Sequence, residues 1–225
     1  MFTELTSRPI TPTHHALLHS LSTVLTYVKE RLAEGVRNVM AKMQEVNYDP
    51  KMAPWLRREM GLRDARELVT AWCEVMCWPL DQKRPVGLPA RPSSLLSHLH
   101  SHLVAWMTTS SSQSNLVLSL AYILSRSSEP FLDLLHQWLG LAPCPEVDDE
   151  SQPWLDLGIT RERIEGRWEY SFTARRMPSF IPRTIRRTLF DAGCSLRALH
   201  EATNGAHPLC NDWSLRANWG WGADA

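Results

Sequence analysis

The residues of this chain that could carry chemistry fall into a few short groups. His98, His100 and His102 form an alternating run, and on a helix His98 and His102 share one face. Two imidazoles at that spacing can bind zinc, but a zinc site needs a third or fourth ligand, and none follows nearby in the sequence. The run therefore favours a polar helix face, and we expect no metal ligand among these histidines.

Cys73 and Cys77 have the same four-residue spacing, beside Trp72 and Met76. A single cysteine pair with no second pair is a weak zinc signal, so buried, small apolar side chains are the favoured interpretation. The chain has an odd number of cysteines and a polar N-terminus without a signal-peptide pattern. We therefore expect reduced thiols in the cytosol or nucleus.

Adjacent carboxylates occur in the run Asp148-Asp149-Glu150, within a segment that the sequence predicts to be a loop. A loop holds carboxylates too loosely for acid–base catalysis, so the run is interpreted as a solvated face. The sequence contains no nucleophile elbow, no HExxH zinc motif and no glycine-rich phosphate loop. It predicts a protein that is not an enzyme, with no catalytic residue, no cofactor and no metal.

A basic group surrounds the start of the last expected helix, and it consists of Arg175, Arg176, Arg183, Arg186 and Arg187. A solvated helix face is the favoured interpretation, while an acidic protein surface and nucleic acid are alternatives. The whole chain balances Lys+Arg 24 against Asp+Glu 24, which argues against nucleic-acid and membrane-surface proteins. The five arginines remain candidates for a partner-facing surface.

Helical spacing of apolar residues dominates the elements that must position these groups. The 225 residues are 44% hydrophobic and 21% charged, which is typical of a globular chain. Apolar stripes with steps of three and four residues predict helices over 13–47, 62–76, 93–106, 116–123, 130–140 and 182–199. Pro130 opens a separate short helix that Gly140 closes, and the pair Ala192-Gly193 interrupts the last helix.

Residues 168–172 alternate like a short strand, and long loops are expected over 79–92 and 141–165. The predicted class is all-α, a helical bundle or array of about six to eight helices with one short strand-like segment and long loops. An irregular lead-in covers residues 1–12, the helical domain covers 13–209, and a Trp/Gly-rich tail covers 210–225.

Tryptophan is abundant, with ten residues in the chain. We expect Trp72, Trp106 and Trp138 to lie in the core because they fall on helical stripes. The others outside the clear stripes are candidates for interface anchors. They are Trp55, Trp154, Trp213, Trp219 and Trp221.

The order of several motifs resembles the N-terminal grip domain of gamma-tubulin complex component proteins. Leu95–Leu99 precedes a helix at Leu116–Ser125. A Pro-aromatic pair follows, and a Leu-x-x-Trp-Leu motif ends that part of the pattern. Later in the chain, a Pro-Ser-Phe motif leads into a helix that contains an Ala-Gly-x-Ser-Leu motif. The residues that match the motifs, which we expect to be mostly structural, are Pro130, Phe131, Leu135, Trp138, Pro178, Ser179, Phe180, Gly193, Ser195 and Leu196. The resemblance covers residues 13–200.

The chain also departs from the family pattern. Cys194 stands where the family has lysine, residues 141–156 replace an acidic-Pro turn and a Glu-Phe strand, and the resemblance stops after Leu209. The resemblance leads us to expect that the C-terminal domain, which holds gamma-tubulin in the family, is absent. The chain is therefore most similar to a divergent, truncated, non-core member of a fungal kind.

The resemblance implies a scaffold subunit that makes lateral contacts with other gamma-tubulin complex components and meets gamma-tubulin only indirectly. It further implies a role in microtubule nucleation and a cytoplasmic, cytoskeletal location at the spindle pole or microtubule-organising centre, with no nucleic-acid or membrane partner. A stand-alone helical interaction module with an unrelated partner is the alternative.

Overall fold

The computed structural model describes residues 11–45, 66–78, 87–109, 115–143 and 151–211. Within these ranges the fold is mostly helical with one small sheet, which confirms the all-α class. The elements are α1 (Pro12–Glu45), a helix over 66–75, α3 (Pro92–Thr109), α4 (Asn115–Trp138), η2 (Leu155–Leu157), β1 (Ile159–Ile164), β2 (Arg167–Phe172), η3 (Ala174–Arg176), α5 (Arg183–Thr203) and α6 (Pro208–Asn211).

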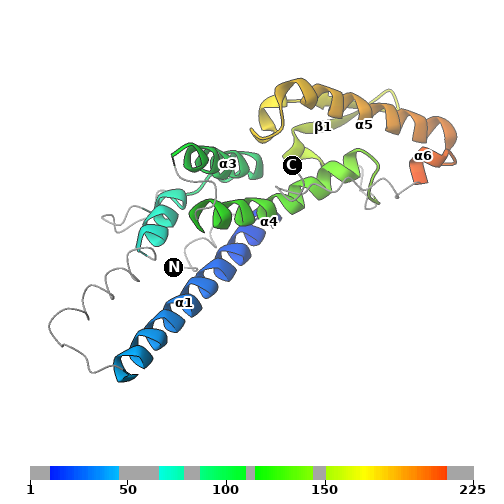
Figure 1. Ribbon diagram of the computed structural model, residues 1–225. Coiled ribbons are helices and arrows are strands. Elements are labelled where there is room, and N and C mark those ends of the chain that lie inside the picture. Colours follow the sequence, from blue (N-terminus) through cyan, green and yellow to red (C-terminus); the bar gives the residue numbers. More distant parts are fainter. Residues whose placement is uncertain (1–10, 46–65, 79–86, 110–114, 144–150, 212–225) are drawn as a thin grey trace.

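Helix α4 is the central element, with α1 and α3 packed on its first part and α5 beside its C-terminal end (Figure 1). Leu17, Leu21 and Val24 form the buried face of α1. Figure 1 shows the C-terminal half of α1 extending past α4. The first turns of α1 therefore use the predicted apolar stripe to pack against α4.

Helix α4 runs without a break from Asn115 to Trp138, so the prediction of two separate helices divided before Pro130 is wrong. A proline inside a helix removes a backbone hydrogen bond and costs about 3 kcal/mol. The buried stripe continues across it, however, through Leu124, Phe131 and Leu135. Burial of each such side chain stabilises by about 1.5–3 kcal/mol, so packing outweighs the proline.

Helix α3 begins at Pro92, one residue before the predicted cap at Ser93. Proline suits the first helical position because its φ is already helical and its missing N–H would have no partner there. The buried leucines of α3 face α4, while Trp106 packs edge-on against Trp72 of the helix over 66–75, with ring centroids 6.2 Å apart. Trp72 lies in the core as expected, whereas Trp106 is only partly buried and packs against the edge of the core.

The expected loop over 141–165 is wrong in its last part, because residues Ile159–Ile164 form β1. This strand pairs antiparallel with β2, whose position was predicted, and Ile159 lies opposite Phe172. Glu165 and Gly166 both have positive φ, 51° and 83°, which is the conformation that a tight two-residue hairpin turn requires. Glu-Gly is a weaker hairpin signal than Asn-Gly, and β1 lacks a clear apolar alternation.

Helix α5 also runs without interruption, through Ala192 and Gly193, and ends where Asn204 adopts a left-handed φ of 47°. The predicted interruption is wrong because Gly193 serves close packing instead of a break, as described below. No helix in the described ranges combines the length and the apolar character needed to cross a membrane. Several predictions concern residues outside the described ranges. These are the acidic run 148–150, residues 62–65, most of the loop over 79–92, most of the tail, and Trp55, Trp213, Trp219 and Trp221.

Candidate functional site

The two segments that carry the strongest motifs meet at a joint between α4 and α5. The indole of Trp138 is fully buried, and its Nε1 donates a hydrogen bond to the carbonyl oxygen of Leu189 at 3.0 Å. A Cβ atom at Gly193 would lie 2.1 Å from that same nitrogen. Only glycine therefore allows the indole to reach the α5 backbone, which explains why these two motif residues occur together.

Arg197 closes the joint from one helical turn beyond Gly193. Its guanidinium lies 4.0 Å from the Trp138 ring centroid and 4.1 Å from that of Trp154. It donates hydrogen bonds to the carbonyl oxygens of Trp138 at 2.5 Å and Gln137 at 3.4 Å. A cation at the C-terminal carbonyls of α4 satisfies acceptors that the helix itself leaves unpaired.

The aromatic surroundings complete this joint. Trp154 is 4% exposed and packs edge-on against Trp138 at 5.2 Å, so it belongs to the core and is not an exposed anchor. Phe190 stacks on Trp138 at 5.9 Å, and Tyr170 from β2 lies at 5.4 Å. The arrangement joins the hairpin, α4 and α5 through one aromatic cluster, in which Phe190 stacks on Trp138 and the other two rings meet it edge-on.

Sequence reasoning missed Arg197 and the burial of Trp154. The four-residue spacing from Gly193 to Arg197, which places both residues on one helix face, is the signal that could have found the arginine. Among the motif residues, Leu196 contacts the joint, because a Cβ atom at Gly140 would lie 2.0 Å from its Cδ2. Ser195 is exposed and donates to the carbonyl of Asp191 at 2.9 Å.

The second motif segment anchors the approach to α5 onto α3. Pro178 is buried, and the backbone N–H of Ser179 donates to Ser97 Oγ at 2.9 Å. The Ser179 hydroxyl and His100 Nδ1 lie 3.1 Å apart, and the His100 ring packs against Phe180 at 6.0 Å. The motif residues therefore connect α3 with the start of α5.

A serine hydroxyl beside a histidine is also the pair that nucleophilic hydrolases use. In those enzymes a third group orients the histidine, and here the pKa of His100 is lowered by burial, with no charged neighbour contributing. Ser179 is exposed on the surface. We interpret the pair as a structural contact between α3 and the segment before α5.

The other histidines of the run also make contacts within the fold. His98 Nε2 donates to the carbonyl of Val75, the last residue of the helix over 66–75, at 2.8 Å, and lies 3.7 Å from Cys77 Sγ. Because a carbonyl can only accept, this nitrogen carries the proton. The rings of His98 and His102 are 4.6 Å apart. The described residues contain no group of three or more His, Cys, Asp or Glu side chains arranged to hold a metal ion.

The five candidate arginines differ in their surroundings. Arg186 donates hydrogen bonds to the carbonyls of Pro178 at 2.8 Å, Ile181 at 2.9 Å and Ala174 at 3.0 Å, so it holds the segment before α5. Arg176 donates to a carbonyl at 3.4 Å, and Arg187 pairs with Asp191 at 3.0 Å. Arg175 and Arg183 are exposed and are the best placed of the five for a partner.

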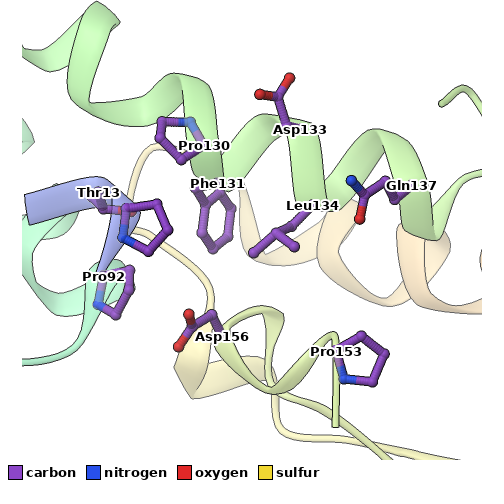
Figure 2. A pocket seen from close by; sticks show the side chains of 10 residues that line it. Thr13, Pro92, Pro130, Phe131, Asp133, Leu134, Gln137, Pro153 and Asp156 are labelled. Atoms are coloured by element: carbon purple, nitrogen blue, oxygen red, sulfur yellow. The ribbon is translucent and has the colours of Figure 1, made fainter. Parts of the chain in front are cut away.

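A cavity of about 350 Å³ lies where the starts of α1 and α3 meet the middle of α4 and η2 (Figure 2). Its lining residues are Pro12, Thr13, Pro92, Pro130, Phe131, Asp133, Leu134, Gln137, Pro153 and Asp156. Figure 2 shows Phe131 and Leu134 on the side of α4 that faces Asp156, while the Asp133 carboxylate points away from them. The cavity thus has mainly apolar walls and few polar groups.

His14 explains why two helix starts meet at this cavity. Its Nε2 donates to the carbonyl of Pro89 at 3.1 Å, and its Nδ1 lies 2.7 Å from the hydroxyl of Thr11. The first turn of α1 is therefore tied to the segment that leads into α3. Asp156 reaches the same place from η2, and burial raises the pKa of its carboxyl group, against smaller opposing effects of Arg176 and His14.

Comparisons with protein-family models, with curated proteins and with solved structures gave no match for this chain.

Proposed function

We propose that this chain is a scaffold subunit of gamma-tubulin complexes, which makes lateral contacts with neighbouring components and thereby contributes to microtubule nucleation. It acts at the spindle pole or microtubule-organising centre and contacts gamma-tubulin only indirectly. The resemblance of its ordered motifs to the N-terminal grip domain supports this proposal, together with a mostly helical architecture.

The observation that carries the proposal is the α4–α5 joint. The motif residues Trp138 and Gly193 pack closely against each other, and Arg197 caps the C-terminal end of α4 at the same point. A scaffold needs helices held at a constant mutual direction, because a lateral contact transmits orientation from one subunit to the next. Motif residues used in this way suit a structural role better than a catalytic one.

Exposed apolar side chains supply candidate contact surfaces on the helices. Val104 and Met107 of α3 are 45% and 52% exposed, and Leu118 of α4 is 58% exposed. Of these exposed side chains, Met107 is of a type that is enriched in protein interfaces, as are the exposed Arg175 and Arg183.

Affinity purification of the tagged chain from its own cells, followed by mass spectrometry, tests the proposal. We expect gamma-tubulin and sister components to be recovered. A variant with Arg175→Glu and Arg183→Glu should recover less of them, whereas Arg167→Glu on the exposed hairpin tip should not. Absence of all gamma-tubulin complex components from the wild-type sample would refute the proposal.

A stand-alone helical interaction module with an unrelated partner is the second candidate. The mostly helical fold and the exposed apolar side chains of α3 and α4 are compatible with it. The same purification distinguishes the two, because this alternative expects one reproducible partner without gamma-tubulin.

A further inference from the structure

The cavity of Figure 2 holds a carboxyl group that the fold leaves without a direct partner. Asp156 is half-buried and forms neither a hydrogen bond nor an ion pair with any described residue. The two basic side chains that act electrostatically on the Asp156 carboxyl group are those of Arg176 and His14. Both form hydrogen bonds elsewhere, since Arg176 donates to the carbonyl of Leu155 at 3.4 Å and His14 to that of Pro89 at 3.1 Å. A half-buried carboxylate without a partner is unfavourable unless something else supplies a donor.

A second polar group faces the same space. Thr13 is only 3% exposed and lines the cavity, yet its hydroxyl makes no hydrogen bond to the described residues. Thr13 Oγ1 is not one of the fully buried, unsatisfied atoms of the described residues, so this hydroxyl is open to the cavity and available to hydrogen-bond a ligand or water there. Thr13 and Asp156 belong to α1 and to η2, and only the tertiary structure brings them together.

Most of the remaining walls are apolar and stiff, with Asp133 and Gln137 as the other polar side chains in the lining. Phe131 and Leu134 face the cavity from α4, and prolines line it from three other segments. Such walls suit an aliphatic stem, and the carboxylate suits a cationic end, which together describe an arginine or lysine side chain. The N-terminal ends of α1 and α3 carry the positive ends of the helix dipoles and therefore disfavour a cation in the cavity. Each is equivalent to only roughly half an elementary charge, whereas the carboxylate carries a full negative charge.

We propose that this cavity is an anchor pocket for a basic side chain, arginine or lysine, of a partner protein, with Asp156 as its counter-ion and Thr13 as an additional hydrogen-bonding group. The inference deepens the scaffold proposal and rests on it for the nature of the partner. The pocket lies where α1, α3, α4 and η2 meet, so an anchored partner would contact the junction of these elements.

The test uses Nα-acetyl-arginine amide as the probe and Nα-acetyl-citrulline amide as its uncharged match. Titration into the isotope-labelled full chain, followed by backbone amide shifts in NMR, should give saturable changes around Thr13 and Asp156. We expect citrulline to bind at least about tenfold more weakly. Asp156→Asn should weaken arginine binding by a similar factor, whereas Glu169→Gln, which removes the same charge from the exposed face of β2, should leave it unchanged.

Equal binding of the two probes, or undiminished arginine binding to folded Asp156→Asn, would overturn the proposal, as would the absence of any saturable shift. Urea unfolding of each variant establishes that it is folded. The titration contains no gamma-tubulin complex component, so its failure and a failure of the scaffold proposal are separate results.

Discussion

At the scale of single residues, Gly193 has the most specific environment in the fold. An added Cβ would overlap the Trp138 indole, and overpacking of this kind costs typically about 1–3 kcal/mol. Alanine is the better helix former by about 1 kcal/mol, so the two effects oppose each other. We expect Gly193→Ala to lower the free energy of unfolding, measured by urea denaturation.

A double-mutant cycle provides the control for this prediction. Trp138→Phe removes Nε1, the atom nearest to the added methyl group. Gly193→Ala should therefore cost less in the Trp138→Phe background than in the wild type. Equal costs in both backgrounds would mean that the glycine is needed for a reason other than the indole.

The carboxyl group of Asp156 has a predictable effect on stability against pH. Burial raises its folded-state pKa above the ordinary value of 3.8, so the folded protein holds the proton more tightly than the unfolded chain does. Stability is then lost as pH rises through this range, because ionising the folded carboxyl group is unfavourable. We expect Asp156→Asn to be more stable than the wild type at pH 7, with the difference vanishing in acid.

Urea unfolding between acid and neutral pH measures this difference. Asp133→Asn is the matched control, since Asp133 is exposed and its carboxylate points away from the other residues of the cavity. A loss of stability in Asp156→Asn at pH 7 would show that the carboxylate has a stabilising partner within the chain.

At the scale of elements, the balance between local preference and burial decides where helices end. Local preference predicted a break before Pro130, yet α4 passes through it because the buried stripe is continuous on both sides. The proline remains a local weakness, since its ring and missing N–H disturb the helix.

Pro130→Ala is therefore expected to raise the free energy of unfolding by about 1–3 kcal/mol, with the gain reduced by the greater freedom of the unfolded chain. Chemical denaturation followed by circular dichroism measures the change. Pro12→Ala, at the first position of α1 where proline is favourable, is the control and should be neutral or destabilising. A destabilised Pro130→Ala would mean that the ring itself makes needed contacts at the cavity.

At the scale of the whole molecule, α4 connects two packing regions. Its first part packs with α1 and α3, and its C-terminal end holds the hairpin and α5 through Trp138 (Figure 1). Removal of a buried tryptophan costs about 3–5 kcal/mol, and here the loss is concentrated on the second region.

We expect Trp138→Ala to increase amide hydrogen exchange more in β1, β2 and α5 than in the first turns of α1 or in α3. Exchange measured by mass spectrometry resolves these segments. Trp72→Ala, which removes a tryptophan that packs against α3, should give the opposite distribution. A uniform increase after Trp138→Ala would indicate one cooperative unit instead of two regions.

The spacing of apolar residues follows the period of each element, so it was sufficient to predict the helical class, most of the helices and the strand over 168–172. The sequence also singled out Trp138 and Gly193, through motifs whose physical purpose it did not reveal. The tertiary structure alone decided that α4 continues through Pro130, that β1 exists, and that Arg197 caps α4. It likewise decided that Thr13 and Asp156 share a cavity, since these contacts join residues far apart in the chain and depend on how the helices pack.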